Sequence, residues 1–319
     1  MAEMKYGQIA GIDKPVSRLA QGTIMVHVDS LEESLPLLDA TFEGGVTLYD
    51  TAYIYGGGGN EKGVGKWVND RGIRDKVVII AKGGHPAAGQ TVVPPEQITS
   101  ELNESLERLG FDYIDLYILH RDPQLPAGEI IDLLNEHKNT GKIRAFGGSN
   151  WTHERIAEAN AYAEASGLTP IAASSPHFSL AVQVKPVWAD CLGISGPDGA
   201  DARAWYAEAN LPLITWSSIA RGFFSGKVTR DDDSILEECS RQGFCYPDNF
   251  DRLERAFELA AQKGLTVPQV ALAYVLNYPL NIFALVGPCT PDEFRENLAA
   301  LDVELTPEEL TWLENGEGR

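Results

Sequence analysis

The stretch Tyr49-Asp50-Thr51-Ala52-Tyr53-Ile54-Tyr55 (YDTAYIY) places a carboxylate and a phenol five positions apart, where a strand should give way to a loop. The residues before Asp50, at positions 45–49 (GVTLY), are apolar and β-branched enough for a buried strand. The four glycines at positions 56–59 cannot continue a strand. We therefore expect Asp50 and Tyr55 at the C-terminal end of a strand.

Two further predicted strands run into a titratable residue in the same way. Residues 77–81 (VVIIA) lead to Lys82, and residues 113–119 (YIDLYIL) lead to His120. Asp, Tyr, Lys and His at three strand ends form a set of groups suited to proton transfer.

The spacing of this set predicts how its members interact. An ammonium beside a phenol favours the phenolate, so we expect Lys82 to lower the pKa of Tyr55 toward neutral pH. Asp50 would then hold and orient Lys82. Two structural alternatives stay open: Asp50 and Lys82 could be an ion pair inside the fold, and His120 could be a capping or core histidine.

Strands and helices alternate along the chain. The eight expected strands cover residues 19–23, 45–49, 77–81, 113–119, 143–147, 171–174, 213–216 and 282–286. The expected helices cover residues 30–43, 60–71, 95–109, 126–140, 152–166, 201–210 and 249–263, the first of them capped by Ser30. This alternation predicts parallel strands joined by helical crossovers. We expect an α/β fold with one domain over residues 1–319, a (β/α)8 TIM barrel with its active site at the C-terminal ends of the strands.

The main alternative topology is an open doubly wound sheet. It would have a glycine fingerprint after the first strand, but residues 19–26 contain only Gly22. A short hairpin is expected before the barrel, at residues 5–14. Two long irregular stretches, residues 176–200 and 221–247, are expected as long βα loops, and loops of this length are usually functional or mobile.

Composition and charge limit the classes of partner. The chain has 319 residues, of which 44% are hydrophobic, and a formal net charge of -20, which argues against nucleic acid and anionic membrane surfaces. No stretch is typical of a signal peptide or a membrane span, so we expect a cytoplasmic protein. The four cysteines lack CxxC spacing and the six histidines lack close pairing, which predicts reduced thiols and no metal site. The oligomeric state stays unknown.

The contexts YDTAYIYG, IIAKGG and DLYILHRDP resemble those of the aldo-keto reductases, and the resemblance covers nearly the whole chain. That family carries Asp and Tyr after the second barrel strand, Lys after the third and His after the fourth. The resemblance implies NAD(P)H-dependent reduction of an aldehyde, ketone or sugar carbonyl to the alcohol, or the reverse. Its catalytic residues would be Asp50, Tyr55 as general acid/base, Lys82 and His120.

The resemblance also implies residues that contact the cofactor. In the first half of the chain these are Gly22, Thr23, Asp50, Ser149, Asn150 and Ser175. In the second half they are Trp216, Ser217, Ile219, Ala220, Arg221, Gly287, Thr290, Glu293, Glu296 and Asn297. Ser149 and Asn150 match the family's nicotinamide-carboxamide pair, although both would also suit the cap of the helix from Thr152. Trp216 stands in place of a tyrosine that stacks on the nicotinamide.

The choice of cofactor depends on two departures from the family's pattern. The basic residue expected near Cys289 is absent, and Glu293 occupies the place of a second one. A carboxylate repels the 2′-phosphate of NADP but accepts hydrogen bonds from the ribose of NAD. We therefore expect NAD(H) to be used at least as readily as NADP(H), unless Arg221 or Arg295 binds the phosphate instead.

Two other function classes remain as alternatives. The chain could be a cofactor-sensing barrel subunit with little catalytic role, or a barrel enzyme of unrelated chemistry such as metal-assisted hydrolysis. The intact catalytic set favours the reductase. The small-molecule substrate is expected to be chosen by loops at residues 25–28, 85–95, 176–200 and 221–247, whose shape the composition does not define.

Overall fold

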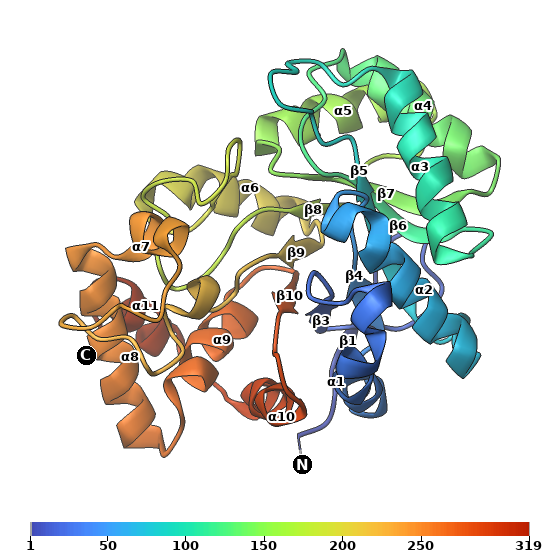
Figure 1. The fold of residues 1–319 in the computed structure, drawn as a ribbon. Helices are drawn as coiled ribbons and strands as arrows, with labels where there is room; N and C mark the ends of the chain where they lie inside the picture. Colours follow the sequence, from blue (N-terminus) through green and yellow to red (C-terminus); the bar gives the residue numbers. More distant parts are fainter. Residues whose placement is uncertain (1, 319) are drawn as a thin grey trace. The chain divides into compact units, whose positions relative to one another are not determined.

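The computed structural model describes residues 2–318 (Figure 1). Its eight parallel strands close a barrel in the order β10-β3-β4-β5-β6-β7-β8-β9. The expected (β/α)8 barrel is therefore confirmed, and the open doubly wound sheet is wrong. Two compact units make up the chain, residues 6–175 and residues 176–318 with residues 2–5, and each is described by itself below. Residues 1 and 319 of the expected domain lie outside the described residues.

Residues 6–175 contribute six strands to the barrel, and each pairs with the next one along the chain. They are β3 (Leu19–Gly22), β4 (Leu48–Asp50), β5 (Val78–Gly83), β6 (Ile114–Leu119), β7 (Ile143–Ser149) and β8 (Ala173–Ser175). The register places Asp50 beside Gly22 on one side and Ile80 on the other. Nearly all these strand residues are buried, as their β-branched and apolar sequence predicts.

Five α-helices connect these strands. They are α1 (Leu31–Glu43), α2 (Gly59–Arg71), α3 (Pro95–Leu109), α4 (Ala127–Asn139) and α5 (His153–Ala165). The expected side-chain cap at Ser30 is wrong, because a 3-10 turn, η1 (Val28–Ser30), precedes α1 and Ser30 makes no capping bond. Thr152, in contrast, caps α5 by accepting a hydrogen bond from Arg155 N at 3.2 Å.

The N-terminal hairpin lies partly outside its expected range. β1 (Tyr6–Gly7) pairs antiparallel with β2 (Val16–Ser17), so the second strand follows residues 5–14 instead of lying within them. The reason is Lys14, whose ammonium binds Asp115 Oδ1 at 2.7 Å and Val77 O at 2.6 Å. These contacts, together with the burial of Ile9 and Ile12, hold the intervening residues as a packed loop.

Residues 176–318 contribute the strands β9 (Leu213–Thr215) and β10 (Ile282–Val286), which pair in parallel. Their α-helices are α6 (Ala200–Ala209), α7 (Glu238–Phe244), α8 (Pro247–Lys263), α9 (Val267–Asn277), α10 (Pro291–Ala299) and α11 (Pro307–Asn315). Four of them, α7, α9, α10 and α11, lie outside the expected helix ranges. Helix α9 buries every residue from Val270 to Val275, so its sequence lacks the polar face by which an amphipathic helix is recognised.

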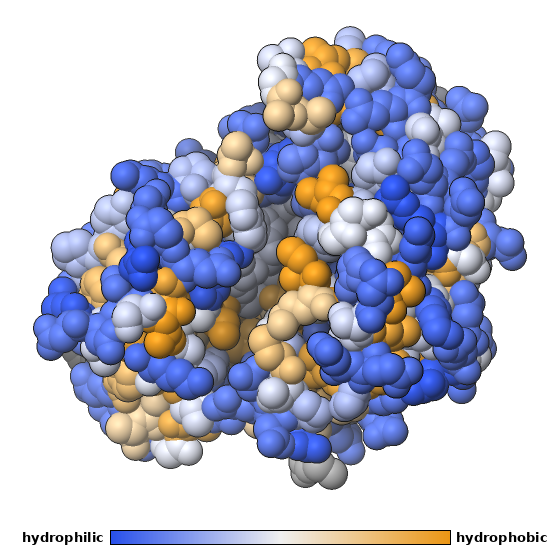
Figure 2. All heavy atoms as spheres, viewed as in Figure 1, coloured by the Kyte–Doolittle hydropathy of each residue, from blue (hydrophilic) through white to orange (hydrophobic). Residues whose placement is uncertain are grey.

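The face drawn in Figure 2 is largely hydrophilic, with hydrophobic residues in small separate patches. Within residues 2–318, no helix has the length and apolar character needed to span a membrane. The same residues contain no cluster of three or more His, Cys, Asp or Glu side chains suited to a metal ion.

Candidate active site

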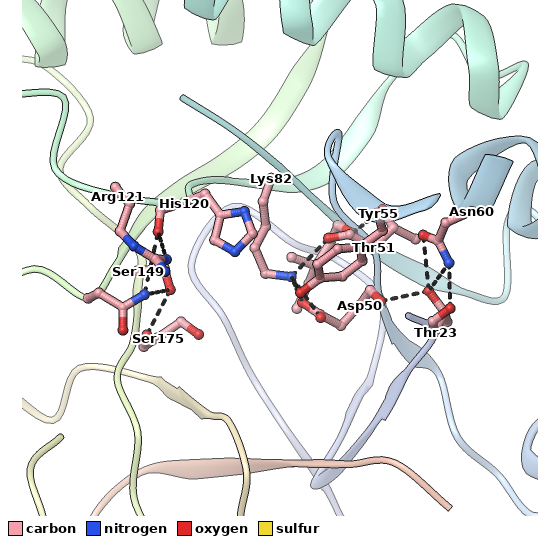
Figure 3. A network of polar contacts seen from close by, with 12 residues as sticks. Thr23, Asp50, Thr51, Tyr55, Asn60, Lys82, His120, Arg121, Ser149 and Ser175 are labelled. Atoms are coloured by element: carbon pink, nitrogen blue, oxygen red, sulfur yellow. Dashed lines mark hydrogen bonds and ion pairs between the residues drawn. The ribbon is translucent and has the colours of Figure 1, made fainter. Parts of the chain in front are cut away.

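Asp50, Tyr55 and Lys82 meet at the C-terminal ends of β4 and β5 (Figure 3). Lys82 Nζ lies 2.6 Å from Asp50 Oδ1 and 2.7 Å from Oδ2, and it donates to Thr51 O at 2.9 Å. The same nitrogen is 3.4 Å from the Tyr55 hydroxyl. Asp50 and Lys82 are buried, whereas Tyr55 is half-buried. The expected Asp50–Lys82 ion pair is therefore present, and the same Lys82 ammonium also contacts the Tyr55 phenol.

The glycines after Tyr55 turn the chain sharply into α2. Gly56, Gly57 and Gly58 have φ values of 54°, 59° and 89°, in the left-handed region that favours glycine. A Cβ at Gly59 would lie 1.9 Å from His27 Nε2. The run is therefore required by backbone conformation and by close packing, and it ends the strand as expected.

Asn60 is a site residue that the sequence did not reveal. Its side-chain amide donates to Thr23 O and, at 3.0 Å, to Val26 O, while Thr23 Oγ1 donates to Asp50 O at 2.8 Å. This chain of bonds ties the start of α2 to the ends of β3 and β4. Its one sequence signal is a polar residue directly after the glycine run, at a helix start that proves fully buried.

His120 follows β6, and its ring lies against that of Tyr55. The two rings meet edge to face with centroids 5.9 Å apart, and His120 N donates to Gly83 O at 2.7 Å. His120 Nδ1 is buried and has no hydrogen-bond partner within residues 2–318. Burial, with the nearby cations of Lys82 and Arg121, holds the pKa of His120 well below 6.5. The imidazole is therefore neutral at pH 7 and able to donate a single N–H.

The expected lowering of the Tyr55 pKa is wrong for this structure. Burial raises the pKa of Tyr55 above 10, and Lys82 opposes that rise without overcoming it. Burial is the largest cause of the rise, and the negative charge of Asp50 beside the same ammonium adds to it. Burial disfavours the Lys82 ammonium, but Asp50 and Tyr55 outweigh this and raise the pKa of Lys82 above 10.5. Tyr55 therefore holds its proton at neutral pH beside a permanent cation.

Ser149 and Asn150 form a polar pair at the end of β7. Ser149 Oγ donates to Ser175 O at 2.9 Å, and the Asn150 amide donates to Ser149 Oγ at 3.0 Å and to His120 O at 3.4 Å. The capping interpretation is wrong, since Thr152 caps α5. Asn150 has a φ of 61°, a strained conformation typical of functional sites. The pair has the donors and acceptors that fit a carboxamide.

Trp216 and the residues after it lie in the unit 176–318. Trp216 is buried and its Nε1 has no partner within residues 2–318, while its ring is 5.0 Å from that of His177 and 5.8 Å from that of Trp188. The next residues turn tightly, because Ser217, Ala220 and Arg221 all have φ between 51° and 54°. Ile219 lies within this turn, at the start of η4 (Ala220–Gly222).

Arg221 is already engaged within its own unit. Its Nη2 lies 2.6 Å from Glu237 Oε2, its Nε donates to Ser240 Oγ at 2.9 Å, and its guanidinium lies 4.4 Å from the centroid of the Trp188 ring. Binding a phosphate through Arg221 would compete with the Glu237 ion pair. These contacts argue against Arg221 as the residue that binds the 2′-phosphate of NADP.

The residues expected at the adenosine end, Gly287, Thr290, Glu293, Glu296 and Asn297, lie between the end of β10 and the body of α10. Thr290 caps α10 by accepting from Glu293 N at 3.2 Å, and Glu293 Oε2 accepts from Cys289 N at 2.7 Å. Arg295, the one basic residue of α10, pairs with Asp292. The first turn of α10 therefore presents carboxylates and no unpaired cation of its own.

Comparisons with known proteins agree over nearly the full chain. The model described as "Aldo/keto reductase family" matches residues 18–315. An aldo-keto reductase of Gibberella moniliformis is 32% identical over 291 residues, which cover 88% of this chain and 83% of the relative. A thermostable aldo-keto reductase solved with the inhibitor epalrestat has a TM-score of 0.74 and 24% identity, covering 98% of this chain and 99% of its own. An aldo-keto reductase of Klebsiella pneumoniae in complex with NADPH has a TM-score of 0.72 and 25% identity, covering 98% and 94%.

Proposed function

The chain belongs to the aldo/keto reductase family, a family of oxidoreductases that use a nicotinamide cofactor, and on this premise we propose its reaction. It reduces an aldehyde, ketone or sugar carbonyl to the alcohol, or catalyses the reverse, and residues 1–319 act as one domain. The observation that carries the proposal is the contact of Lys82 Nζ with both the Asp50 carboxylate and the Tyr55 hydroxyl.

Each catalytic residue has one task in this reaction. A bound nicotinamide supplies or accepts the hydride. Tyr55 donates its phenolic proton to the oxygen that becomes the alcohol, and the Lys82 ammonium stabilises the phenolate that forms. Asp50 holds Lys82 in place through its two short contacts. Neutral His120 donates a hydrogen bond to the same substrate oxygen.

The residues assigned to the cofactor are those that the family resemblance implies. Ser149 and Asn150 at the end of β7 would bind the carboxamide. Ser175 at the end of β8, and Gly22, Thr23 and Asp50 at the ends of β3 and β4, are assigned further cofactor contacts. Trp216 would stack on the nicotinamide. The other assigned residues are Ser217, Ile219, Ala220, Arg221, Gly287, Thr290, Glu293, Glu296 and Asn297.

NAD(H) is the cofactor that the first turn of α10 favours. Asp292 and Glu293 lie in that turn, and Arg295 is paired with Asp292. A 2′-phosphate placed there would face carboxylates, which repel it. Fluorescence-quenching titrations with NADH and NADPH measure the two dissociation constants. Binding of NADPH a hundredfold tighter than NADH would contradict this assignment.

The Tyr55→Phe variant tests the reaction. We expect kcat to fall by roughly 100- to 10,000-fold, the usual value of general acid catalysis, while the dissociation constant of the cofactor stays nearly unchanged. Tyr53→Phe is the matched control, because the Tyr53 hydroxyl donates to Glu104 at 3.0 Å and not to a catalytic residue. A Tyr55→Phe enzyme with more than about a tenth of the activity would assign the proton to another group. A chain that binds the cofactor and reduces no carbonyl would favour the cofactor-sensing subunit instead.

A further inference from the structure

His85 brings a second imidazole to the catalytic histidine. It follows β5 by two residues, and its ring lies edge to face against that of His120, with centroids 5.2 Å apart and planes at 81°. Gly84, with a φ of 70°, makes the turn between the strand and His85. A Cβ at Gly84 would come within 3.2 Å of the Leu119 side chain, so strand packing limits where this turn can go.

The hydrogen bonding of His85 determines which nitrogen is free. Its Nδ1 lies 2.9 Å from Pro86 O. A carbonyl oxygen only accepts hydrogen bonds, so Nδ1 carries a hydrogen, and in the tautomer with this single N–H the other nitrogen, Nε2, holds a lone pair. Within residues 2–318 Nε2 has no hydrogen-bond partner, and it is not among the buried unpaired atoms. The half-buried His85 therefore offers an accessible acceptor nitrogen next to His120.

We propose that His85 is a specificity-determining residue, whose Nε2 accepts a hydrogen bond from a hydroxyl group on the carbon next to the reacting carbonyl. This deepens the proposed function and rests on it, because that function places the carbonyl oxygen at Tyr55 and His120. In an α-hydroxy carbonyl compound the two oxygens sit on neighbouring carbons. The contact between the two rings brings the His120 donor and the His85 acceptor together, as binding to both oxygens requires.

The substrate class that follows is the α-hydroxy aldehydes and ketones, including open-chain sugars. A site with an acceptor for a hydroxyl discriminates against an analogue that lacks it, because the buried or half-buried acceptor is then left unpaired. A carbonyl compound with a methyl group at that position would leave His85 Nε2 without a partner and without water.

Hydroxyacetone and butan-2-one provide the test, since they differ only by a hydroxyl in place of a methyl group. In the His85→Phe variant a ring still packs against His120, but the acceptor nitrogen is gone. We expect the ratio of kcat/KM for hydroxyacetone to that for butan-2-one to fall by about 3- to 10-fold, the value of one neutral hydrogen bond. The kcat/KM for butan-2-one should stay within about twofold of wild type, because the ring packing is retained.

His153→Phe is the control for the substitution itself. His153 opens α5 and lies 3.2 Å from Glu154, so its loss should leave the ratio unchanged. An equal fall for both ketones in His85→Phe would overturn the proposal and make His85 a residue that only positions His120. An unchanged ratio would overturn it as well.

A binding measurement gives a readout that does not depend on turnover. In the full-length chain with ¹⁵N-labelled histidine, hydroxyacetone should shift the His85 Nε2 resonance and butan-2-one should not. If the enzyme reduces both ketones and the resonance does not respond to hydroxyacetone, this inference fails and the proposed function stands. If Tyr55→Phe retains full activity, the proposed function fails whatever the resonance shows.

Discussion

The Lys82 ammonium contacts a carboxylate at 2.6 Å and a phenol at 3.4 Å, and in the proposed reaction the two contacts have different tasks. The shorter contact holds the charge in place. The longer contact stabilises the phenolate only when Tyr55 loses its proton, which is the moment at which a catalyst needs the stabilisation. Burial keeps the resting phenol protonated and therefore competent as an acid.

Replacing Lys82 by Met should raise the apparent pKa of the acid in the pH–rate profile and lower turnover. Lys82 is the strongest of the interactions that oppose the burial of Tyr55, so without it the pKa of Tyr55 rises further. Because the single variant leaves a buried carboxylate unpaired, the double variant Lys82→Met/Asp50→Asn is the better-folded comparison. A slower enzyme whose pH–rate profile has not moved would make Lys82 a structural partner of Asp50 alone.

At the scale of the element, the N-terminus of α10 is capped from two sides. Thr290 accepts from the backbone N–H of Glu293, and the Glu293 carboxylate accepts from the N–H of Cys289. Glu293 therefore has a structural task that the sequence comparison did not suggest. An experiment on Glu293 therefore has to distinguish the effect of its negative charge on cofactor binding from the effect of its hydrogen bond to Cys289 N–H.

Two substitutions of Glu293 make that separation. Glu293→Gln keeps an acceptor for Cys289 N–H and removes the charge, whereas Glu293→Arg adds a cation that can bind a 2′-phosphate. We expect Glu293→Arg to shift binding toward NADPH by roughly 1 to 2 kcal/mol and Glu293→Gln by less. The measurement is the ratio of dissociation constants for NADPH and NADH. If wild type and both variants give the same ratio, Glu293 does not lie close enough to the 2′-phosphate to affect its binding.

The packing of α2 against the end of α3 gives a prediction about stability. A Cβ at Gly65 would lie 2.2 Å from Leu109 O, so an alanine there forces two backbones apart. We expect Gly65→Ala to lower the free energy of unfolding by about 1 to 3 kcal/mol in urea denaturation, although alanine favours helices over glycine. Lys62→Ala, at an exposed position of the same helix, is the control. A stabilised Gly65→Ala variant would contradict the close approach.

For the whole molecule, His177 links stability to pH. Its ring is fully buried beside Trp216 and Phe244, and neither nitrogen has a partner within residues 2–318. Burial lowers the pKa of His177 from 6.5 to about 3. Below pH 6.5 the unfolded chain binds a proton at this histidine that the folded chain does not bind. The stability contributed by neutral His177 is therefore complete above pH 6.5 and is lost as the pH falls toward 3.

This linkage predicts a difference between wild type and His177→Phe. Between pH 6 and pH 4 the wild-type free energy of unfolding should fall more steeply, by up to about 1.4 kcal/mol for each pH unit. Urea denaturation at several pH values measures both slopes, and the other titrating groups, which both proteins share, cancel in the difference. Parallel slopes would mean that His177 is protonated or solvated in the folded chain.

The sequence by itself determined the barrel, the order of its strands and the position of Asp50, Lys82 and His120 at strand ends. These features depend on local patterns, because apolar runs, glycine breaks and helix starts are set by neighbouring residues. The same reasoning failed for α9, because a largely buried helix has no polar face. It also failed for the second strand of the hairpin, which begins only after Lys14 has made its contact with Asp115.

Only the tertiary structure decided what each polar group binds. Arg221 pairs with Glu237, and the Glu293 carboxylate accepts a hydrogen bond from the backbone N–H of Cys289. The pKa of Tyr55 rises, although the sequence spacing alone predicted that it would fall. The Tyr55 hydroxyl contacts Lys82, which is 27 residues away on β5. Lys82 in turn is paired with Asp50 on the neighbouring strand β4. A pKa is the balance between the loss of hydration and charges brought close by folding, and neither quantity exists until the strands are side by side.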